Sequence, residues 1–454
     1  MLKKNDIIPL VITDITGQGS GIGRVDGMAV FVPMTAVGDE INARILKVKK
    51  NYAFGKTESI EKPSDKRISP DCECYSKCGG CVFRHITYEE ELSVKQRRVY
   101  DAITRIGGIR DFEMHDIVGC DSPDAYRNKT QIPVGRDKNG ALLTGFYGSH
   151  SHRIVGSGQC RLQPEDFNEI VSIIREFITE NGIGVYDEET HSGLLRHIYL
   201  RKGFQSGEIM VCLVINGTSL PHAETLVRRL TEYSSNVKSI MLNINRDKTN
   251  VVLGRELSVL YGSECITDTL CGLRFNISPL SFYQINHDQT EKLYALAAKC
   301  ARLTGEEFLI DLYCGAGTIG LSMAKSAKRV LGVEIIPEAI ENARENARAN
   351  NIKNAEFICA DASKAASELA RRGTRPDVLV IDPPRKGCDG AVIDAAAKMS
   401  PDRVVYVSCD PETLARDLAV FAEKGYVTKE VTPVDMFPRT AHVETVVLMS
   451  KVKE

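Results

Sequence analysis

From about residue 276 to the end of the chain, strand-like apolar runs alternate with helix-like segments, and this alternation restricts the fold more than any other feature. Strands that alternate with helices form a parallel sheet with helices on both faces. The runs that fit buried strands are residues 308–311, 329–334, 355–359, 377–382 and 403–408. Two longer runs follow, at residues 426–434 and 442–450, and they predict a final antiparallel hairpin. The predicted fold class is therefore α/β.

The last of the five runs leads directly into the sequence Ser-Cys-Asp-Pro at residues 408–411. Pro411 cannot extend a strand, and the three residues before it are typical of a tight turn. Cys409 then lies at the carboxyl end of a strand, which is where open α/β sheets bind their ligands. A thiol in that place is a candidate nucleophile, although most single cysteines are only small buried side chains.

A glycine-rich segment, DLYCGAGTIG at residues 311–320, joins the first of these strands to a helix. Glycines at such a turn allow a cofactor to approach the backbone closely. With the acidic Glu334 about twenty residues further on, the segment satisfies the pattern G-x-G-x-x-G, so that NAD and S-adenosylmethionine both fit. The sequence Asp-Pro-Pro-Arg at residues 382–385 and the terminal hairpin favour a class I methyltransferase layout and the modification of a base.

Several polar residues follow the carboxyl ends of the predicted strands and therefore lie at one edge of the sheet. They are Asp311, Glu334, Asp361, Asp382 and Cys409. The final strand runs in the opposite direction, so that its first residues reach the same edge. His442 and Glu444 are two positions apart there and point to one face. We therefore expect the Cys409 thiol and the Glu444 carboxylate to meet, while His442 is closer to a structural role.

A thiol, a carboxylate and a methyl-sulfonium cofactor together predict methylation of uracil at carbon 5. This carbon is a poor nucleophile until a group adds at carbon 6, and the Cys409 thiolate is the candidate for that addition. The resulting enolate takes the methyl group, Glu444 removes the carbon 5 proton as general base, and elimination releases Cys409. Asp382 and Arg385 are candidates for positioning the cofactor and the base. The target base has to leave its stack, because carbon 6 is inaccessible in a duplex.

Residues 1–60 combine short β-rich runs with glycine-rich turns, which predicts a small β-barrel. Basic residues are interleaved with aromatic residues between positions 47 and 56, among them Tyr52 and Phe54. On a small barrel this pattern suits the backbone and bases of RNA, although a solvated hairpin end has a similar composition.

Five of the fourteen cysteines are candidate metal ligands: Cys72, Cys74, Cys78, Cys81 and Cys160. The first four lie close together in the sequence, around two glycines. Thiolates at this density predict an Fe–S cluster or a structural zinc ion. One candidate ligand set is Cys72, Cys78, Cys81 and Cys160. A second register, in which Cys74 replaces Cys72, has the spacing of the radical S-adenosylmethionine enzymes. We favour the first set because the later segments show no barrel of repeated βα units. Cys74 is then a bystander or an alternate ligand.

Residues 61–275 mix strand and helix patterns and predict a central α+β domain that carries the cysteines, between an N-terminal domain (residues 1–60) and a catalytic domain (residues 276–454). The chain shows no export signal, and clustered thiols indicate the reducing cytoplasm. No apolar run approaches the roughly 18 residues of a membrane helix. The net charge of −2 neither requires nor excludes a nucleic-acid partner.

Motifs along nearly the whole chain resemble those of the bacterial TRAM-containing 5-methyluridine methyltransferases of 23S ribosomal RNA. The matching motifs are GSGIGR at residues 19–24, FVP at 31–33, the four cysteines of the first set, SFYQIN at 281–286, DLYCGAG at 311–317, GVE at 332–334, DPPR at 382–385, SCDP at 408–411 and HVE at 442–444. The sequence departs from this family at Asp410, where Asn is more frequent, at Tyr283, where Phe is frequent, and at the additional Cys74.

The resemblance implies an OB-like TRAM domain that binds RNA, and a Rossmann-like, class I S-adenosylmethionine-dependent catalytic domain. It implies that the cofactor is bound by Gln284, Tyr313, Glu334 and Asp382. It also implies that Cys409 is the nucleophile and Glu444 the base, and that a [4Fe–4S] cluster is held by Cys72, Cys78, Cys81 and Cys160. The implied partner is 23S ribosomal RNA, at single-stranded or loop uridines, and we expect a cytoplasmic monomer.

Other hypotheses stay open at this stage. Transfer RNA is an alternative substrate for the same chemistry. A radical S-adenosylmethionine enzyme, an RNA-binding Fe–S protein with a relict methyltransferase domain and a dinucleotide oxidoreductase belong to other classes. The complete set of cofactor and catalytic positions favours the methyltransferase over these three.

Overall fold

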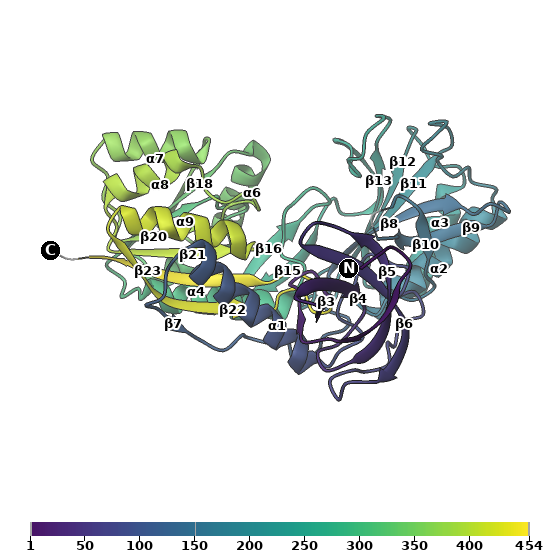
Figure 1. Cartoon of the computed structure of the whole chain (residues 1–454). Coiled ribbons are helices and arrows are strands. Elements are labelled where there is room, and N and C mark those ends of the chain that lie inside the picture. The colour runs from purple at the N-terminus through teal and green to yellow at the C-terminus, as the bar shows by residue number, and fades with distance from the viewer. Residues whose placement is uncertain (1, 150, 453–454) are drawn as a thin grey trace.

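The computed structural model describes residues 2–149 and 151–452, and Figure 1 shows three large β-sheets that follow one another along the chain. The helices are α1 (Tyr88–Asp101), α2 (Glu165–Glu180), α3 (Ala223–Tyr233), α4 (His287–Ala301), α5 (Thr318–Met323), α6 (Pro337–Ala349), α7 (Ala362–Arg371), α8 (Gly390–Met399) and α9 (Pro411–Glu423), with two short helical turns, η1 (Ala102–Ile106) and η2 (Ala324–Ser326). None of the helices in this described part is long and apolar enough to cross a membrane.

The N-terminal sheet has six strands. They are β1 (Ile7–Val11), β2 (Asp14–Ile15), β3 (Ser20–Val25), β4 (Met28–Pro33), β5 (Glu40–Val48) and β6 (Tyr52–Lys62). Alternate residues of β5 are buried, so that Ile41, Ala43 and Ile45 enter a small apolar core. The ladder of described residues runs β1-β5-β6-β4-β3-β2 and leaves β1 and β2 at its edges. Only two residues separate these two edge strands along the chain, and the Thr13 N–H between them donates to the Ile22 carbonyl oxygen at 2.8 Å. The sheet therefore curves back on itself, in agreement with the predicted small barrel. We call this curved sheet the half-barrel.

The central sheet has seven strands and is covered on both faces. The strands are β8 (Lys129–Arg136), β9 (Leu142–Tyr147), β10 (Ile154–Gly156), β11 (Leu195–Lys202), β12 (Ile209–Ile215), β13 (Val237–Ile244) and β14 (Glu256–Gly262). Every residue of β12 is buried, because α2 and α3 pack against one face while α4 and a two-stranded ribbon pack against the other. The ribbon consists of β15 (Ile266–Leu270) and β16 (Leu273–Ile277). A continuous apolar run such as IMVCLVI fits a strand buried on both faces.

The C-terminal sheet contains the candidate site. Its strands are β17 (Phe308–Leu312), β18 (Arg329–Glu334), β19 (Ala355–Cys359), β20 (Val378–Ile381), β21 (Arg403–Ser408), β22 (Tyr426–Val434), β23 (Glu444–Lys451) and the short β7 (Glu113–Met114). Strands β17 to β21 are parallel, and β23 lies antiparallel between β21 and β22. The predicted α/β sheet and its terminal hairpin are confirmed.

Part of the segment that we assigned to the central domain lies on the C-terminal sheet instead. Strand β7 pairs with β22 at the sheet edge, and the apolar face of α1 and η1 packs beside α9 through Val99 and Ile103. Residues 88–106 form α1, followed directly by a π-helical turn. The boundaries at residues 60 and 275 remain predictions.

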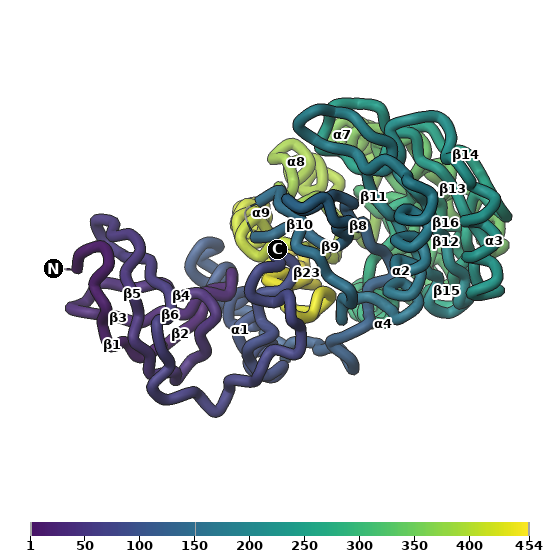
Figure 2. Tube along the Cα trace, turned by 90° about the vertical axis from the view of Figure 1, so that its right-hand side faces the viewer, coloured from purple at the N-terminus to yellow at the C-terminus, as the bar shows by residue number. Residues whose placement is uncertain are grey.

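Figure 2 shows the half-barrel to one side of the molecule, with α1 between it and the other two sheets. A small apolar cluster joins these parts, in which Ile15 of the half-barrel meets Phe83 and Val94. Helix α1 therefore contacts the half-barrel through Val94, near its middle, and the C-terminal sheet through Val99, near its end (Figure 1).

Candidate active site

The candidate nucleophile directly follows one strand, and the candidate base begins the neighbouring antiparallel strand. The ladder between β21 and β23 pairs Arg403 with Ser450 and continues in register to Ser408 and Thr445. Cys409 follows Ser408, and Glu444 precedes Thr445, so both residues lie at the same end of this ladder. They are close enough for the Glu444 carboxylate to raise the pKa of the Cys409 thiol. The structure thus brings together the two residues that strand directions predicted to meet.

Cys409 lies between the end of a strand and the start of a helix. Helix α9 begins at Pro411, and its N-cap Asp410 accepts a hydrogen bond from the Thr413 backbone N–H at 2.9 Å. Asn caps a helix as well as Asp does, which accounts for the departure at position 410. Burial raises the pKa of the Cys409 thiol to about 12, with Glu444 and Asp382 adding to the rise. The N-terminus of α9 and the Arg385 guanidinium both favour the thiolate.

Glu444 is the first residue of β23, and its side chain is only 4% exposed. Burial raises the pKa of Glu444 to about 8, Asp382 raises it further and Arg385 lowers it. The strand begins two residues later than we predicted, so that His442 belongs to the preceding turn and the argument from strand spacing does not apply to it. His442 is exposed, with its Nε2 atom 3.4 Å from Nη2 of Arg385.

The glycine-rich segment forms a tight connection between β17 and α5. The Gly320 backbone N–H donates to Asp311 Oδ2 at 2.9 Å, and a Cβ atom at position 320 would lie 2.9 Å from the same oxygen. Only glycine allows this approach. The Gly315 N–H donates to Oε2 of Glu334 at 3.2 Å, which ties the glycine turn to the end of β18.

Four carboxylates lie close together in the candidate cofactor cleft, at this edge of the sheet: Asp311, Glu334, Asp382 and Glu444. Burial raises the pKa of Asp311 to about 8, and the neighbouring Asp382 and Glu334 contribute to that rise. Burial also raises the pKa of Asp382 to about 7. Oδ1 of Asp311 is buried and has no hydrogen-bond partner within the described residues. These acids fit a cationic ligand, because a positive charge among them stabilises their ionised forms. The sulfonium of S-adenosylmethionine carries such a charge.

The two remaining predicted cofactor residues lie at the borders of this region. Tyr313, in the glycine-rich turn, has a left-handed backbone with φ +67°, which is uncommon for a residue with a side chain. Gln284 is partly buried, and its backbone carbonyl oxygen accepts a hydrogen bond from Asn128 Nδ2 at 2.7 Å. The nearby Tyr283 donates its hydroxyl to Asp268 at 3.1 Å, so a tyrosine is accommodated where the family often has Phe.

Exposed apolar side chains beside Glu334 were not among our sequence predictions. Ile335 and Ile336 are 59% and 53% exposed, and their backbone N–H groups donate to Glu334 Oε1 at 2.8 and 2.9 Å. Phe282, two residues before Gln284, is 64% exposed. An apolar pair directly after a strand's terminal acid is the signal that would have identified the first two. Such side chains suit the face of an aromatic ring.

The five candidate ligand cysteines, Cys72, Cys74, Cys78, Cys81 and Cys160, line one small cavity of about 50 Å³ between the loop at residues 72–81 and the central sheet. Burial raises the pKa of Cys81 to about 11 and also raises the pKa of Cys78 and Cys160, and each of these thiols is close enough to another to affect its charge. The Cys74 thiol donates to the carbonyl oxygen of Gly156 at 3.3 Å. The arrangement brings Cys160 to the other cysteines, as the first ligand set requires.

The thiols surround the cavity and do not converge on one point. Among the described residues, no three His, Cys, Asp or Glu side chains are close enough to hold a single metal ion. Arg84, Arg127 and Arg161 line the same cavity, and Nε of Arg127 has no hydrogen-bond partner in the described part of the chain. A donor set of soft thiols beside three cations suits a polynuclear iron–sulfur group with a net negative charge.

The sequence matches two known families over separate segments. Residues 260–452 match tRNA (Uracil-5-)-methyltransferase, and residues 2–57 match the TRAM domain. Similar chains include an uncharacterized RNA methyltransferase of Clostridium tetani, 47% identical over 99% of this chain and 97% of the relative, and another of Halalkalibacterium halodurans, 46% identical over 99% and 98%. Among solved structures, the Pyrococcus abyssi tRNA (uracil-54, C5)-methyltransferase in complex with S-adenosyl-L-homocysteine is 30% identical, with a TM-score of 0.77 over 97% of this chain and 99% of that one.

The sheet, the glycine-rich cleft and these similarities define an S-adenosylmethionine-dependent methyltransferase with an N-terminal TRAM half-barrel. The chain belongs to the family of RNA (uracil-5-)-methyltransferases.

Proposed function

We propose that this enzyme methylates carbon 5 of single-stranded or loop uridines in 23S ribosomal RNA, through a covalent bond between Cys409 and carbon 6. The observation that carries the covalent route is that Cys409 directly follows β21 at the end of its ladder with β23, and Glu444 begins β23 at that same end. Membership of the family supports methylation of uracil, and the position of Cys409 beside Glu444 supports the choice of these two residues as nucleophile and base.

In the proposed reaction, Cys409 attacks carbon 6 of uracil as the thiolate, and the carbon 5–carbon 6 double bond becomes an enolate. S-adenosylmethionine supplies the electrophilic methyl group that bonds to carbon 5. Glu444 then takes the proton from carbon 5, the bond between Sγ and carbon 6 breaks, and Cys409 leaves as the thiolate. Because burial raises the pKa of Glu444 to about 8, its carboxylate is a stronger base than that of an exposed glutamate.

We assign cofactor binding to Gln284, Tyr313, Glu334 and Asp382. Support comes from the four-carboxylate cleft, from the hydrogen bond between Gly315 and Glu334, and from the left-handed turn at Tyr313. Arg385, which lowers the pKa values of both Cys409 and Glu444, orients the two reacting groups.

We further propose that Cys72, Cys78, Cys81 and Cys160 hold a [4Fe–4S] cluster, and that Cys74 is not a ligand. The shared cavity and the hydrogen bond of Cys74 to Gly156 support this assignment. Residues 1–60 are assigned to RNA binding, and residues 61–275 to the domain that carries the cysteines. We expect a monomer in the cytoplasm, and the free thiols of the described chain fit that reducing compartment.

Transfer RNA is the second candidate substrate, because the similar Pyrococcus abyssi protein is a tRNA methyltransferase. The decisive experiment offers radiolabelled S-adenosylmethionine with unmodified 23S ribosomal RNA and, separately, unmodified transfer RNA, and maps the labelled nucleotides. We expect 5-methyluridine in ribosomal RNA at one or two positions. Label in transfer RNA alone would overturn the substrate and keep the chemistry.

A further inference from the structure

The turn that precedes the candidate base, residues 435–443, is held from several distant parts of the chain. Its backbone carbonyl groups accept hydrogen bonds from outside the turn at almost every step. The donors are Gln289 Nε2 to Asp435 at 3.0 Å, Asn286 Nδ2 to Met436 at 3.1 Å, Lys95 Nζ to Phe437 at 3.2 Å, the Tyr126 hydroxyl to Pro438 at 3.0 Å and Arg98 Nη1 to Ala441 at 2.8 Å. These residues come from α1, from the central domain and from the start of α4. The position of the turn is therefore set by all of them.

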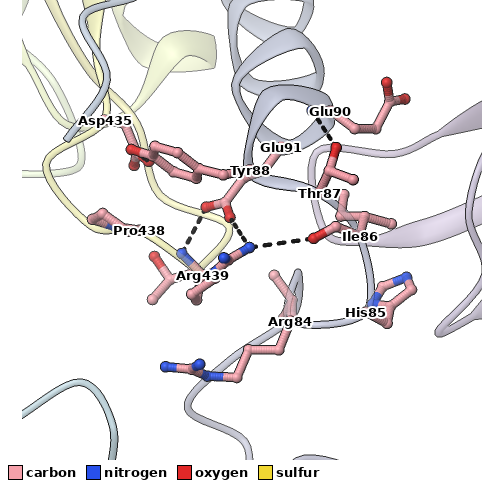
Figure 3. Close-up of polar contacts among 12 residues, drawn as sticks. Arg84, His85, Ile86, Thr87, Tyr88, Glu90, Glu91, Asp435, Pro438 and Arg439 are labelled. Atoms are coloured by element: carbon pink, nitrogen blue, oxygen red, sulfur yellow. Dashed lines mark hydrogen bonds and ion pairs between the residues drawn. The ribbon is translucent and has the colours of Figure 1, made fainter. Parts of the chain in front are cut away.

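Arg439 is the most constrained residue of the turn. Its backbone is left-handed, with φ +68°, although it is not a glycine. Its N–H donates to Oε1 of Glu91 at 2.6 Å, and its carbonyl oxygen accepts from the N–H groups of Val82 and Phe83 at 2.8 and 3.2 Å. Figure 3 shows its side chain between Glu91 and the Ile86 carbonyl. The residues directly after Cys81 thus bond to a position five residues before Glu444.

A buried ionic network anchors the same turn to α1. Lys95 Nζ lies 2.7 Å from a carboxylate oxygen of Glu91 and 2.7 Å from one of Asp435, and all three side chains are at most 1% exposed. The Tyr88 hydroxyl donates to the other oxygen of Asp435 at 2.8 Å. Buried ion pairs contribute little net stability, because desolvation offsets their attraction, so their use here points to precise placement.

We propose that Glu91, Lys95, Asp435 and Arg439 are positioning residues for Glu444, and that they align the base with carbon 5 of the uracil bound to Cys409. The proposal rests on the proposed covalent mechanism. A displaced Glu444 leaves addition and methyl transfer possible but slows removal of the carbon 5 proton. Since the Sγ–carbon 6 bond breaks only when that proton leaves, the enzyme then stays bonded to methylated RNA.

The test uses the full-length protein with its RNA substrate and S-adenosylmethionine, and measures turnover together with the fraction of protein in a detergent-stable complex with RNA. For Glu91→Gln we expect kcat to fall by about 10-fold or more, as for loss of general base catalysis, while the covalent fraction rises. Glu444→Gln shows the full effect and serves as the reference. Tyr126→Phe, which removes a single hydroxyl bond to Pro438, gives a smaller change in the same direction.

Glu90→Gln is the matched control, because Glu90 is the neighbouring residue on α1 and pairs with Lys66 at 2.6 Å. Figure 3 shows its carboxylate pointing away from Arg439. We expect its turnover and covalent fraction to match those of the unchanged enzyme.

Three results separate the possibilities. An unchanged covalent fraction in both Glu91→Gln and Tyr126→Phe would overturn the positioning role. An equal effect of Glu90→Gln would overturn it too, because weakening of α1 would then be the cause. If Glu444→Gln forms no stable complex while Cys409→Ala is inactive, the failure lies in the proposed base and not in its positioning.

Discussion

The active-site edge and the cysteine pocket both collect acidic groups from distant parts of the chain, but by different kinds of structure. At the active-site edge, parallel strands end together and an antiparallel ladder places Glu444 at the same end as Cys409. In the cysteine pocket, irregular loops bring Cys160 to Cys72, Cys78 and Cys81. Burial raises pKa values in both places, to about 8 for Glu444 and to about 11 for Cys81.

The difference lies in how the protein compensates for the charge. The cysteine pocket has its own cations, Arg84, Arg127 and Arg161, beside the thiols. The active-site edge has four carboxylates, and the Arg385 guanidinium is the cation that lowers the pKa values of both Cys409 and Glu444. We infer that the cleft depends on a transient cationic ligand, whereas the pocket suits a permanent anionic group. The following predictions test that contrast, beginning with the largest expected effect.

Replacement of the candidate nucleophile should abolish the reaction. We expect Cys409→Ala to lower methyl transfer by about 10⁴-fold or more, because no other group activates carbon 5. The measurement is incorporation of labelled methyl groups into RNA. Cys388→Ala, at a buried thiol beyond the end of β20, is the control and should retain activity. Residual turnover of Cys409→Ala above about one per cent would contradict the covalent route.

Replacement of one pocket cysteine should remove metal and leave the cleft intact. We expect anaerobically purified Cys160→Ser to lose most of its iron and acid-labile sulfide, because one of four ligands is gone. The measurement is elemental analysis together with the visible absorption spectrum. Cys74→Ser is the matched control, and its iron content should equal that of the unchanged protein. Loss of iron from Cys74→Ser would instead indicate that Cys74 is a ligand.

The affinity for S-adenosylmethionine relative to S-adenosylhomocysteine should increase with pH. Asp382, Asp311 and Glu444 have pKa values of about 7, 8 and 8, so they are largely protonated at pH 6 and ionised at pH 9. Only the methylated cofactor carries the sulfonium charge that ionised acids attract. We expect the ratio of the two dissociation constants to change by about 10-fold across this range, which corresponds to one pKa unit of coupling. Calorimetry in two buffers should also detect proton release. A ratio independent of pH would contradict an electrostatic role for the cleft.

The smallest effect concerns stability. The pKa of Asp382 is higher in the folded protein than its value of about 3.9 in the unfolded chain. Ionisation of Asp382 therefore lowers the free energy of unfolding as pH rises above that unfolded value, and this loss is complete above pH 7. We expect Asp382→Asn to raise Tm by about 2–4 °C at pH 8, with a smaller gain at pH 5, and to weaken binding of S-adenosylmethionine at pH 8. Thermal unfolding measures the first effect. A lower Tm at pH 8 would show that the ionised carboxylate is stabilised by contacts within the protein.

Much of the fold was predictable because its elements carry local patterns. The bounds expected for β18, β19, β21 and β22 coincide with those observed. The proximity of Cys409 to Glu444 followed from strand directions alone. Ile335 and Ile336 were missed, although the apolar pair directly after the acid that ends β18 was a local signal for them.

Spacing and alternation along the sequence determined the order of strands and helices, the edge at which the acids and Cys409 lie, and the grouping of the cysteines. Each of these follows from short-range geometry, since strand direction and turn chemistry are encoded within a few residues. Only the tertiary structure decided that β7 and α1 join the C-terminal sheet, and that Lys95 reaches Asp435 across 340 positions. Contacts over such separations depend on how whole elements pack, and no local pattern records that packing.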